Sequence, residues 1–235
     1  MNIALVGYGK MGKTIEEIAV ANGHTIGLKI DLNNADDLCA QKVVGIDVVI
    51  EFTGPESAFD NVMRCLSLGL PVVCGSTGWL EKYDEAKIYC EANHGTLIYA
   101  SNFSIGVNLF FEINKTLAAL MSKHPSYEAS IHEIHHTQKK DAPSGTAITL
   151  AEQIIKKIDR KTNWSIDSNS LETLFIKDVR EGEVPGTHII KYSSDVDDIE
   201  IMHKAHNRKG FALGAVIAAE FLNGKKGIYT MSDII

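Results

Sequence analysis

The stretch Ile3-Ala4-Leu5-Val6-Gly7-Tyr8-Gly9-Lys10-Met11-Gly12 opens the chain with an apolar run followed by closely spaced glycines. An apolar run without polar alternation is typical of a strand that is covered on both faces. In the glycine spacing that follows, the first glycine permits a tight turn, the second lets a pyrophosphate approach the backbone, and the third lets a helix lie close to the strand. We therefore predict a strand over residues 2–6, a dinucleotide-binding turn, and a helix over residues 10–22.

Asp31 supports this prediction, because it ends the next predicted strand, residues 24–30, at the distance expected of a ribose-binding acid. Its carboxylate suits a ribose 2′-hydroxyl and repels a 2′-phosphate, and the following Leu32 offers no compensating positive charge. We expect NADH to be used at least as well as NADPH, although Lys10 and Lys13 could attract a phosphate. The alternative is a structural glycine turn in an α/β domain that binds no nucleotide.

Further strands and helices alternate up to about residue 103. Strands are expected at residues 47–52, 71–74 and 97–100, with helices that run up to Gly69 and over residues 81–93. This alternation predicts an α/β fold with a Rossmann-like, doubly wound parallel sheet. Ligands of such sheets bind beyond the carboxyl ends of the strands. Small, polar residues occupy three of these ends: Thr53-Gly54, Gly75-Ser76-Thr77-Gly78 and Ser101-Asn102-Phe103.

The pattern changes after Phe103. Helices are expected over residues 106–123 and 146–159, and strands over 127–134, 173–179, 186–192 and 199–205. Strands that follow one another predict a second, α+β domain with a mixed or antiparallel sheet. A helix of small residues over 212–222 is interpreted as a return to the first domain. We therefore predict a first domain of residues 1–103 plus 214–235 and a second domain of residues 104–213.

Composition narrows the class of protein. The chain has 235 residues, 45% of them hydrophobic, and a net charge of −7. An acidic chain is a poor candidate for nucleic-acid binding, which requires a basic face. Its four cysteines show no CxxC spacing and are expected to be reduced, and no apolar run is long enough to cross a bilayer. With no segment that resembles a signal peptide, we expect a cytoplasmic protein that binds neither membrane nor nucleic acid.

The segment Glu133-Ile134-His135-His136-Thr137-Gln138-Lys139-Lys140-Asp141-Ala142-Pro143-Ser144-Gly145-Thr146-Ala147 concentrates the reactive side chains. Neighbouring side chains of a strand point to opposite faces, so one of the two histidines would transfer a proton and the other would bind substrate or support the loop. Lysine adds a fixed positive charge for a carboxylate. Ser144 is a good N-cap, and Gly145 and Thr146 would offer N–H groups and a hydroxyl to a second carboxylate. The segment therefore indicates a site for a small dianion.

Other interpretations of the segment are a solvated histidine, a surface lysine pair, or a zinc site. For zinc the candidates are His132, His135 and His136. No cysteine or carboxylate accompanies them in a familiar ligand spacing, and strand geometry would splay them. We therefore expect no metal.

The run His135-His136-x-x-Lys139-x-Asp141-Ala142-Pro143-Ser144-Gly145-Thr146-Ala147 closely resembles the signature of the 4-hydroxy-tetrahydrodipicolinate reductases, the dihydrodipicolinate reductase family of lysine and diaminopimelate biosynthesis. The resemblance covers nearly the whole chain. Besides the glycine turn, it includes Glu51-Phe52-Thr53-Gly54-Pro55-Glu56, Gly75-Ser76-Thr77-Gly78, Ala100-Ser101-Asn102-Phe103-Ser104, Val184-Pro185-Gly186-Thr187 and His203-Lys204-Ala205.

The resemblance implies an oxidoreductase that uses NADH or NADPH to reduce a cyclic dicarboxylate to tetrahydrodipicolinate. It implies that His135 is the proton donor and that Lys139 assists it and binds substrate. It also implies that the second domain binds substrate and forms a homotetramer through its sheet. The implied substrate-binding residues are His136, Lys139, Ser144, Gly145 and Thr146. The implied cofactor-binding residues are Gly7, Tyr8, Gly9, Lys10, Met11, Gly12, Asp31, Gly75, Ser76, Thr77, Ala100, Ser101, Asn102 and Phe103.

The chain departs from the family pattern at three places. The glycine turn is one residue shorter than in many members, and Leu32 replaces a basic residue that often follows the acid, so both bear on cofactor preference. The stretch between residues 187 and 203 is short, which bears on the oligomer. Two other functional classes remain open: a different nicotinamide enzyme, such as a small aldehyde or sugar dehydrogenase, and a non-catalytic NADH-sensing protein.

Overall fold

The computed structural model describes all residues, 1–235, and their contacts divide the chain into two compact units. The first unit consists of Met1–Ile105 and Lys209–Ile235, and the second of Gly106–Arg208. The predicted return of the chain at residue 214 lies inside a helix that begins at Lys209, so this helix belongs to the first unit from its first residue. No helix combines the length and apolar character needed to cross a membrane.

The first unit is built on a six-stranded sheet in which every neighbouring pair of strands is parallel. Its strands, in spatial order, are β11 (Gly227–Tyr229), β5 (Thr96–Tyr99), β4 (Val72–Cys74), β3 (Val48–Glu51), β1 (Asn2–Val6) and β2 (Thr25–Ile30). Its helices are α1 (Lys10–Ala21), α2 (Ala58–Ser67), α3 (Tyr83–Ala92) and α6 (Lys209–Leu222), with short 3-10 helices at Leu32–Asp37, Leu80–Lys82 and Met231–Asp233. The sequence predicted this doubly wound architecture, and the structure confirms it.

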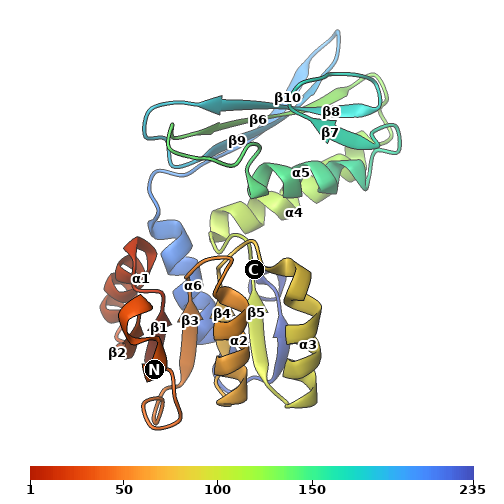
Figure 1. Cartoon of the computed structure of the whole chain (residues 1–235). Coiled ribbons are helices and arrows are strands. Elements are labelled where there is room, and N and C mark those ends of the chain that lie inside the picture. The colour runs from red at the N-terminus through yellow and green to blue at the C-terminus, as the bar shows by residue number, and fades with distance from the viewer. The chain divides into compact units, whose positions relative to one another are not determined.

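Alternating side chains of each strand pack into two separate cores. Ala4 and Val6 of β1 face α2 and α3, whereas Ile3 and Leu5 face α1 and α6. Both sets are buried, which explains why the strand shows no polar alternation. Figure 1 shows the helices of this unit on the two faces of its sheet.

The second unit has a five-stranded sheet that is mixed rather than purely antiparallel. Its strands, in spatial order, are β10 (Asp198–Lys204), β9 (Thr187–Ser193), β6 (Glu128–His135), β8 (Thr173–Arg180) and β7 (Asn163–Ser165). β6 pairs antiparallel with β9 but parallel with β8, and β7 is parallel to β8. The parallel pairing of β6 with β8 arises because helix α5 (Gly145–Ile155) lies between them in the chain, and a crossover of this kind returns the chain in the same direction.

Two helices and one face of this second sheet form its core. Helix α4 (Ile105–Met121) and α5 contribute Phe110, Ala118 and Leu150, which join Ile131 and Ile176 from the strands (Figure 1). Along β6 the buried residues alternate with half-buried ones up to its last residue. The side chains at positions 133 and 135 therefore point to the same face as the core residues at 129 and 131.

Candidate active site

The glycine turn after β1 is shaped by close backbone contacts. Gly7 has φ +95°, and a Cβ at this position would lie 2.1 Å from the carbonyl oxygen of Phe52. A Cβ at Gly12 would lie 2.3 Å from the carbonyl oxygen of Gly7. A Cβ at Gly9, by contrast, would have no heavy atom within 4 Å, and Gly9 caps α1 with extended backbone and no side-chain hydrogen bond. The first N–H groups of α1 are thus placed to bind an anion.

A cavity of about 400 Å³ adjoins this turn at the carboxyl ends of β1, β2 and β3. It lies within the size range of small-molecule and cofactor sites. Asp31 lines it, and its carboxylate accepts a hydrogen bond from the backbone N–H of Leu32 at 2.9 Å. The other lining residues are Val6, Gly7, Gly9, Ile30, Leu32, Ala35, Phe52, Thr53, Gly54, Pro55, Glu56, Ser57 and Asn61.

The buried carboxylate of Glu51 joins the ends of β3 and β4. It accepts hydrogen bonds from the hydroxyl of Ser76 at 3.0 Å and from the backbone N–H of Thr53 at 3.1 Å. The same N–H also donates to the hydroxyl of Ser76 at 2.7 Å. Gly75 lies against the ring of Phe52, where a Cβ would meet Cζ at 2.1 Å. Glu51 was not predicted as a site residue. It shapes the loops after β3 and β4, which were predicted to lie at the ligand-binding edge of the sheet.

The remaining predicted cofactor residues lie in the same unit. Tyr8 follows Gly7, and its hydroxyl donates to the carboxylate of Glu16. Lys10 and Met11 begin helix α1, Thr77 is exposed in the loop after β4, and Ala100 to Phe103 follow β5. The turn, Asp31 and the ends of β4 and β5 all belong to this carboxyl edge of the sheet. This is the edge where parallel α/β sheets bind ligands.

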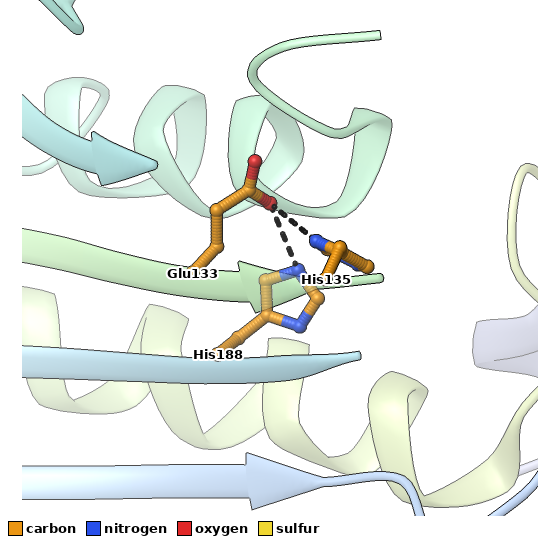
Figure 2. Close-up of side chains that lie close together, drawn as sticks. All are labelled: Glu133, His135 and His188. Atoms are coloured by element: carbon orange, nitrogen blue, oxygen red, sulfur yellow. Dashed lines mark ion pairs between the residues drawn. The ribbon is translucent and has the colours of Figure 1, made fainter. Parts of the chain in front are cut away.

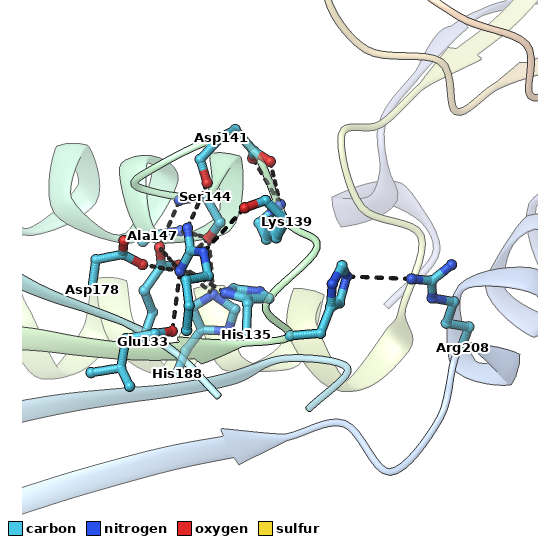
Figure 3. Close-up of polar contacts among 12 residues, drawn as sticks. Glu133, His135, Lys139, Asp141, Ser144, Ala147, Asp178, His188 and Arg208 are labelled. Carbon is cyan, nitrogen blue, oxygen red and sulfur yellow. Dashed lines mark hydrogen bonds and ion pairs between the residues drawn. The ribbon is translucent and has the colours of Figure 1, made fainter. Parts of the chain in front are cut away.

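In the second unit the adjacent histidines occupy different surroundings. His135 is the last residue of β6 and is only 7% exposed. His136 is half-buried, and its Nε2 lies 3.4 Å from a guanidinium nitrogen of Arg208 (Figure 3). The two imidazoles are therefore not equivalent, as the alternation of a strand predicts.

Glu133 lies beside His135 on the same face of β6 and is fully buried. Its Oε2 is 3.4 Å from Nδ1 of His135 and 3.3 Å from Nε2 of His188. Figure 2 shows both imidazoles directed at this one carboxylate. His188 comes from β9, where it is the direct antiparallel partner of Glu133.

The start of helix α5 is bound to the same carboxylate. The backbone N–H of Ser144 donates to Oε1 of Glu133 at 2.8 Å, and its hydroxyl donates to Oε2. The Ser144 hydroxyl also accepts from the backbone N–H of Ala147 at 3.2 Å, which makes Ser144 the N-cap. Because Ser144 is buried, Gly145 and Thr146 are the first residues of the helix that reach the surface.

Lys139 lies on the loop between β6 and α5, and Arg180 fixes this loop. The Nζ of Lys139 contacts both carboxylate oxygens of Asp141, at 2.8 and 2.7 Å. The guanidinium of Arg180 donates to the carbonyl oxygen of Asp141 at 2.6 Å and to that of Lys139 at 3.4 Å. It also pairs with Asp178 on its own strand (Figure 3). Arg180 was not predicted from the sequence.

The charges of this cluster oppose one another. Burial, together with the nearby His188, Lys139 and Arg180, lowers the pKa of His135 to about 4, although Glu133 acts in the opposite direction. Burial acts to raise the pKa of Glu133, but hydrogen bonds from His188 and Ser144 outweigh it and bring that pKa to about 2. At neutral pH, the carboxylate is therefore ionised and His135 is neutral in the absence of substrate.

The histidines considered for zinc from the sequence are not brought together. His135 faces the core side of the sheet, whereas His132 is half-buried on the opposite face of β6. Instead, donor atoms of Glu133, His135 and His188 lie within 4.8 Å of one another, a spacing that a metal ion could use. Both oxygens of Glu133 already accept hydrogen bonds from Ser144, so we interpret the cluster as a hydrogen-bonded network.

Comparisons with known proteins identify the family of this chain. Residues 1–103 match the family model "Dihydrodipicolinate reductase, N-terminus", and residues 106–235 match "Dihydrodipicolinate reductase, C-terminus". A 4-hydroxy-tetrahydrodipicolinate reductase from Christiangramia forsetii is 48% identical and aligns over 100% of this chain and 98% of its own length. The enzyme of the same name from Neisseria meningitidis serogroup C is 34% identical, over 94% of this chain and 83% of its own length.

Among solved structures, the fold is similar to that of a dipicolinate-bound dihydrodipicolinate reductase from Paenisporosarcina sp. TG-14. The TM-score is 0.77 at 23% identity, and the match covers 100% of this chain and 99% of the other. At this identity the likeness supports the fold, while the family models and the two sequence relatives confirm the family resemblance.

The depressed pKa of His135 predicts how stability depends on pH. In the unfolded chain this group takes up a proton near its ordinary pKa of 6.5, whereas the folded protein takes it up only near pH 4. Its contribution to stability is therefore lost as the pH falls below about 6.5. We expect the free energy of unfolding to fall by about 1–2 kcal/mol more between pH 7 and pH 5 in the wild type than in His135→Asn.

Denaturant titrations at pH 7 and pH 5 measure this difference. The control is His124→Asn, because His124 is exposed. The same pH dependence in the wild type and in His135→Asn would show that His135 is not held neutral by the fold.

Proposed function

Since this chain belongs to the dihydrodipicolinate reductase family, we propose that its two units together reduce 4-hydroxy-tetrahydrodipicolinate to tetrahydrodipicolinate in lysine biosynthesis. The chain is an oxidoreductase with a Rossmann-type unit, so its reductant is a nicotinamide cofactor. The observation that carries the assignment of roles is the cluster around His135. It combines a buried imidazole, a lysine and a helix start on one unit.

The first unit fits a dinucleotide. The glycine turn leaves no room for side chains at Gly7 and Gly12 but is open at Gly9, and Asp31 lines the adjoining cavity. The N–H groups at the start of α1 would hold the pyrophosphate, and Asp31 would accept from a ribose hydroxyl. We assign the nicotinamide end to the loops after β4 and β5, residues 75–77 and 100–103. When bound, NADH or NADPH supplies the hydride.

The second unit fits a dicarboxylate. Lys139 provides a mobile positive charge for one carboxylate, which would replace Asp141 as its partner. Gly145 and Thr146, at the exposed start of α5, offer backbone N–H groups and the positive end of the helix to the other carboxylate. His136, half-buried and close to Arg208, adds a third polar contact to the same surface. Holding both carboxylates fixes the orientation of the ring, and orientation contributes to the rate.

His135 transfers the proton. Hydride addition to the conjugated ring leaves negative charge on the substrate, which a proton from the imidazolium neutralises. The N–H bond of His135 breaks, a C–H bond forms, and the imidazole becomes neutral. When the hydrated ring is the substrate, its hydroxyl first leaves as water with a proton from the neighbouring ring carbon, and this elimination forms the conjugated double bond.

Substrate binding would raise the pKa of His135. In the free protein the imidazole is neutral because of burial and because Lys139 and Arg180 are nearby. Two carboxylates placed close to the site offset those positive charges and favour the protonated imidazole. The proton donor is thus formed when its substrate is bound.

We also propose that the chain forms a homotetramer through the sheet of the second unit. On β10, Met202 is an apolar side chain that is 61% exposed, and its register partner on β9 is Ile189. The face of this sheet that α4 and α5 do not cover also carries a hollow of about 230 Å³, lined in part by His132, Phe175 and Lys177. Apolar groups on an open sheet face are typical of subunit interfaces.

We expect light scattering coupled to gel filtration to give a mass near four times 25.7 kDa. Met202→Asp places a charge in the proposed interface and should shift the mass toward smaller species. The matched control is Val196→Asp, since Val196 is 89% exposed in the turn between β9 and β10. A wild-type mass near 25.7 kDa would exclude the tetramer.

We expect His135→Ala to lower kcat by roughly 100-fold or more, the usual contribution of a general acid, with unchanged affinity for NADH. In the wild type, the fall of kcat/KM with rising pH should occur at lower pH than the fall of kcat, because kcat/KM reports the free protein and kcat the substrate complex. Steady-state rates of chelator-treated protein over a range of pH measure both kcat and kcat/KM. His124→Ala is the control, and wild-type turnover by His135→Ala would remove the assigned role.

The carboxylate of Asp31 is expected to decide the preference between NADH and NADPH. We expect kcat/KM for NADH to equal or exceed that for NADPH, because the carboxylate repels a 2′-phosphate. Asp31→Asn should raise the NADPH-to-NADH ratio of kcat/KM roughly tenfold, as expected when one solvent-screened like-charge contact is removed. Asp36→Asn, which changes an exposed acid of the 3-10 helix that Asp31 caps, lies outside the cavity lining and is the control. A strong preference of the wild type for NADPH would contradict this prediction.

A further inference from the structure

The carboxylate of Glu133 is fully buried, yet the roles assigned above leave it outside direct contact with substrate. A buried ion is costly unless it is hydrogen-bonded and paired. Its position on β6, two residues before His135, directs both side chains to the same face of the sheet. A buried carboxylate at position 133 is therefore expected to have a function that a neutral side chain could not perform.

The contact between Glu133 and His135 distinguishes the two ring nitrogens. Nδ1 of His135 is buried, lacks a hydrogen-bond partner, and points toward Oε2 of Glu133 at 3.4 Å. Nε2 lies on the other side of the ring, beside Gly186, where a Cβ would be 3.1 Å away. A side chain there would crowd Nε2, and glycine leaves this nitrogen uncovered.

His188 forms a second contact with Glu133 from the opposite strand. Its Nε2 lies 3.3 Å from the carboxylate and 3.1 Å from the hydroxyl of Ser144. The rings of His188 and His135 meet edge to face, with centroids 5.1 Å apart and an interplanar angle of 71°. His188 thus packs against His135 and limits rotation of its ring.

We propose that Glu133 is a positioning residue that holds His135 as the Nδ1–H tautomer, so that Nε2 carries the proton transferred to substrate, with His188 restraining the ring. This inference rests on the proposed function and adds to it the nitrogen that reacts. Glu133 also accepts from the backbone N–H of Ser144, the N-cap of α5. One carboxylate thereby aligns the proton donor with the helix start that binds substrate.

The proton balance follows from this tautomer. Protonated His135 carries hydrogen on both nitrogens, with Nδ1–H directed at Glu133. The Nε2–H bond breaks as the substrate C–H bond forms, which leaves the neutral Nδ1–H imidazole, and solvent restores the Nε2 proton. The ionised groups around His135 are Glu133 on its own strand, Arg180 on β8 and Lys139 on the following loop. His188 on β9 is the remaining titratable neighbour, and it is itself the register partner of His203 on β10.

The decisive measurement is the tautomer of His135 in the free protein, read from ¹⁵N chemical shifts of histidine-labelled wild type and assigned with His135→Asn. Neutral histidine in water favours the Nε2–H form, so a dominant Nδ1–H form at pH 7 requires an acceptor such as Glu133. We expect that form in the wild type and its loss in Glu133→Gln. A dominant Nε2–H form in the wild type would overturn the proposal.

Kinetics supply a second readout. We expect Glu133→Gln to lower kcat at least tenfold, to leave NADH affinity unchanged, and to move the fall of kcat to lower pH, because the charge that favours protonated His135 is gone. Glu133→Asp keeps the charge and should recover part of kcat. Glu152→Gln, an exposed acid on α5, is the matched control. Wild-type kcat in a folded Glu133→Gln protein would overturn the proposal.

Different outcomes test the proposed reductase function and the proposed role of Glu133. If the wild type does not reduce the substrate, the proposed function fails, whatever the tautomer. If the wild type reduces it and needs His135, but His135 is the Nε2–H tautomer, only the role of Glu133 fails. Should Glu133→Gln not fold, the wild-type spectrum and Glu133→Asp still decide.

Discussion

The cluster around His135 depends on one buried negative charge, the carboxylate of Glu133. Four segments contact it: β6 supplies His135, β9 supplies His188, β8 supplies Arg180, and the start of α5 supplies the N–H and hydroxyl of Ser144. Each contact offsets part of the cost of burying an ion, and together the contacts fix His135 and the start of α5, which the proposed reaction uses. The arrangement that makes the charge tolerable is therefore the same arrangement that aligns the site.

Backbone contacts play the corresponding part in the first unit. The turn at Gly7 packs against Phe52, and Gly75 packs against the ring of the same residue. In helix α6, a Cβ at Gly214 would lie 1.7 Å from the carbonyl oxygen of Phe103. Glycines therefore bring the ends of β1, β4 and β5 close to neighbouring backbone at the edge where the cofactor is proposed to bind. A side chain at such a position would overpack and destabilise the unit. The same glycines are therefore needed for the local fold and for the shape of the site.

The sequence predicted what depends on local pattern. An apolar run without alternation predicted β1, the alternation of strands and helices predicted the parallel sheet, and helical spacing predicted α1 to α6 within a few residues. The order of strands in the second sheet and its parallel pairs depend on tertiary pairing, which no local pattern specifies. Strand β7 was missed because its three residues, Asn163 to Ser165, include a single apolar side chain.

The same distinction explains which residues of the His135 cluster could be predicted from the sequence. Glu133 could have been identified, because a residue two positions before His135 must share its face in a strand. His188 and Arg180 could not, because they reach the site only through the register of β6 with β9 and β8. Register is set by the whole sheet, and a slip of one residue would turn both side chains to the other face.

A neutral His135 in the free protein bears on substrate selection. Burial, Lys139 and Arg180 all disfavour the imidazolium, and Glu133 alone does not overcome them. A ligand with one carboxylate would neutralise one positive charge, whereas a dicarboxylate at Lys139 and the α5 start would add two negative charges near the ring. Because Coulomb interactions are stronger at a buried site than in water, the second charge has a large effect on the fraction of protonated donor. The requirement for a dianion would then act through the availability of the proton as well as through binding, which links recognition of the substrate to its reduction.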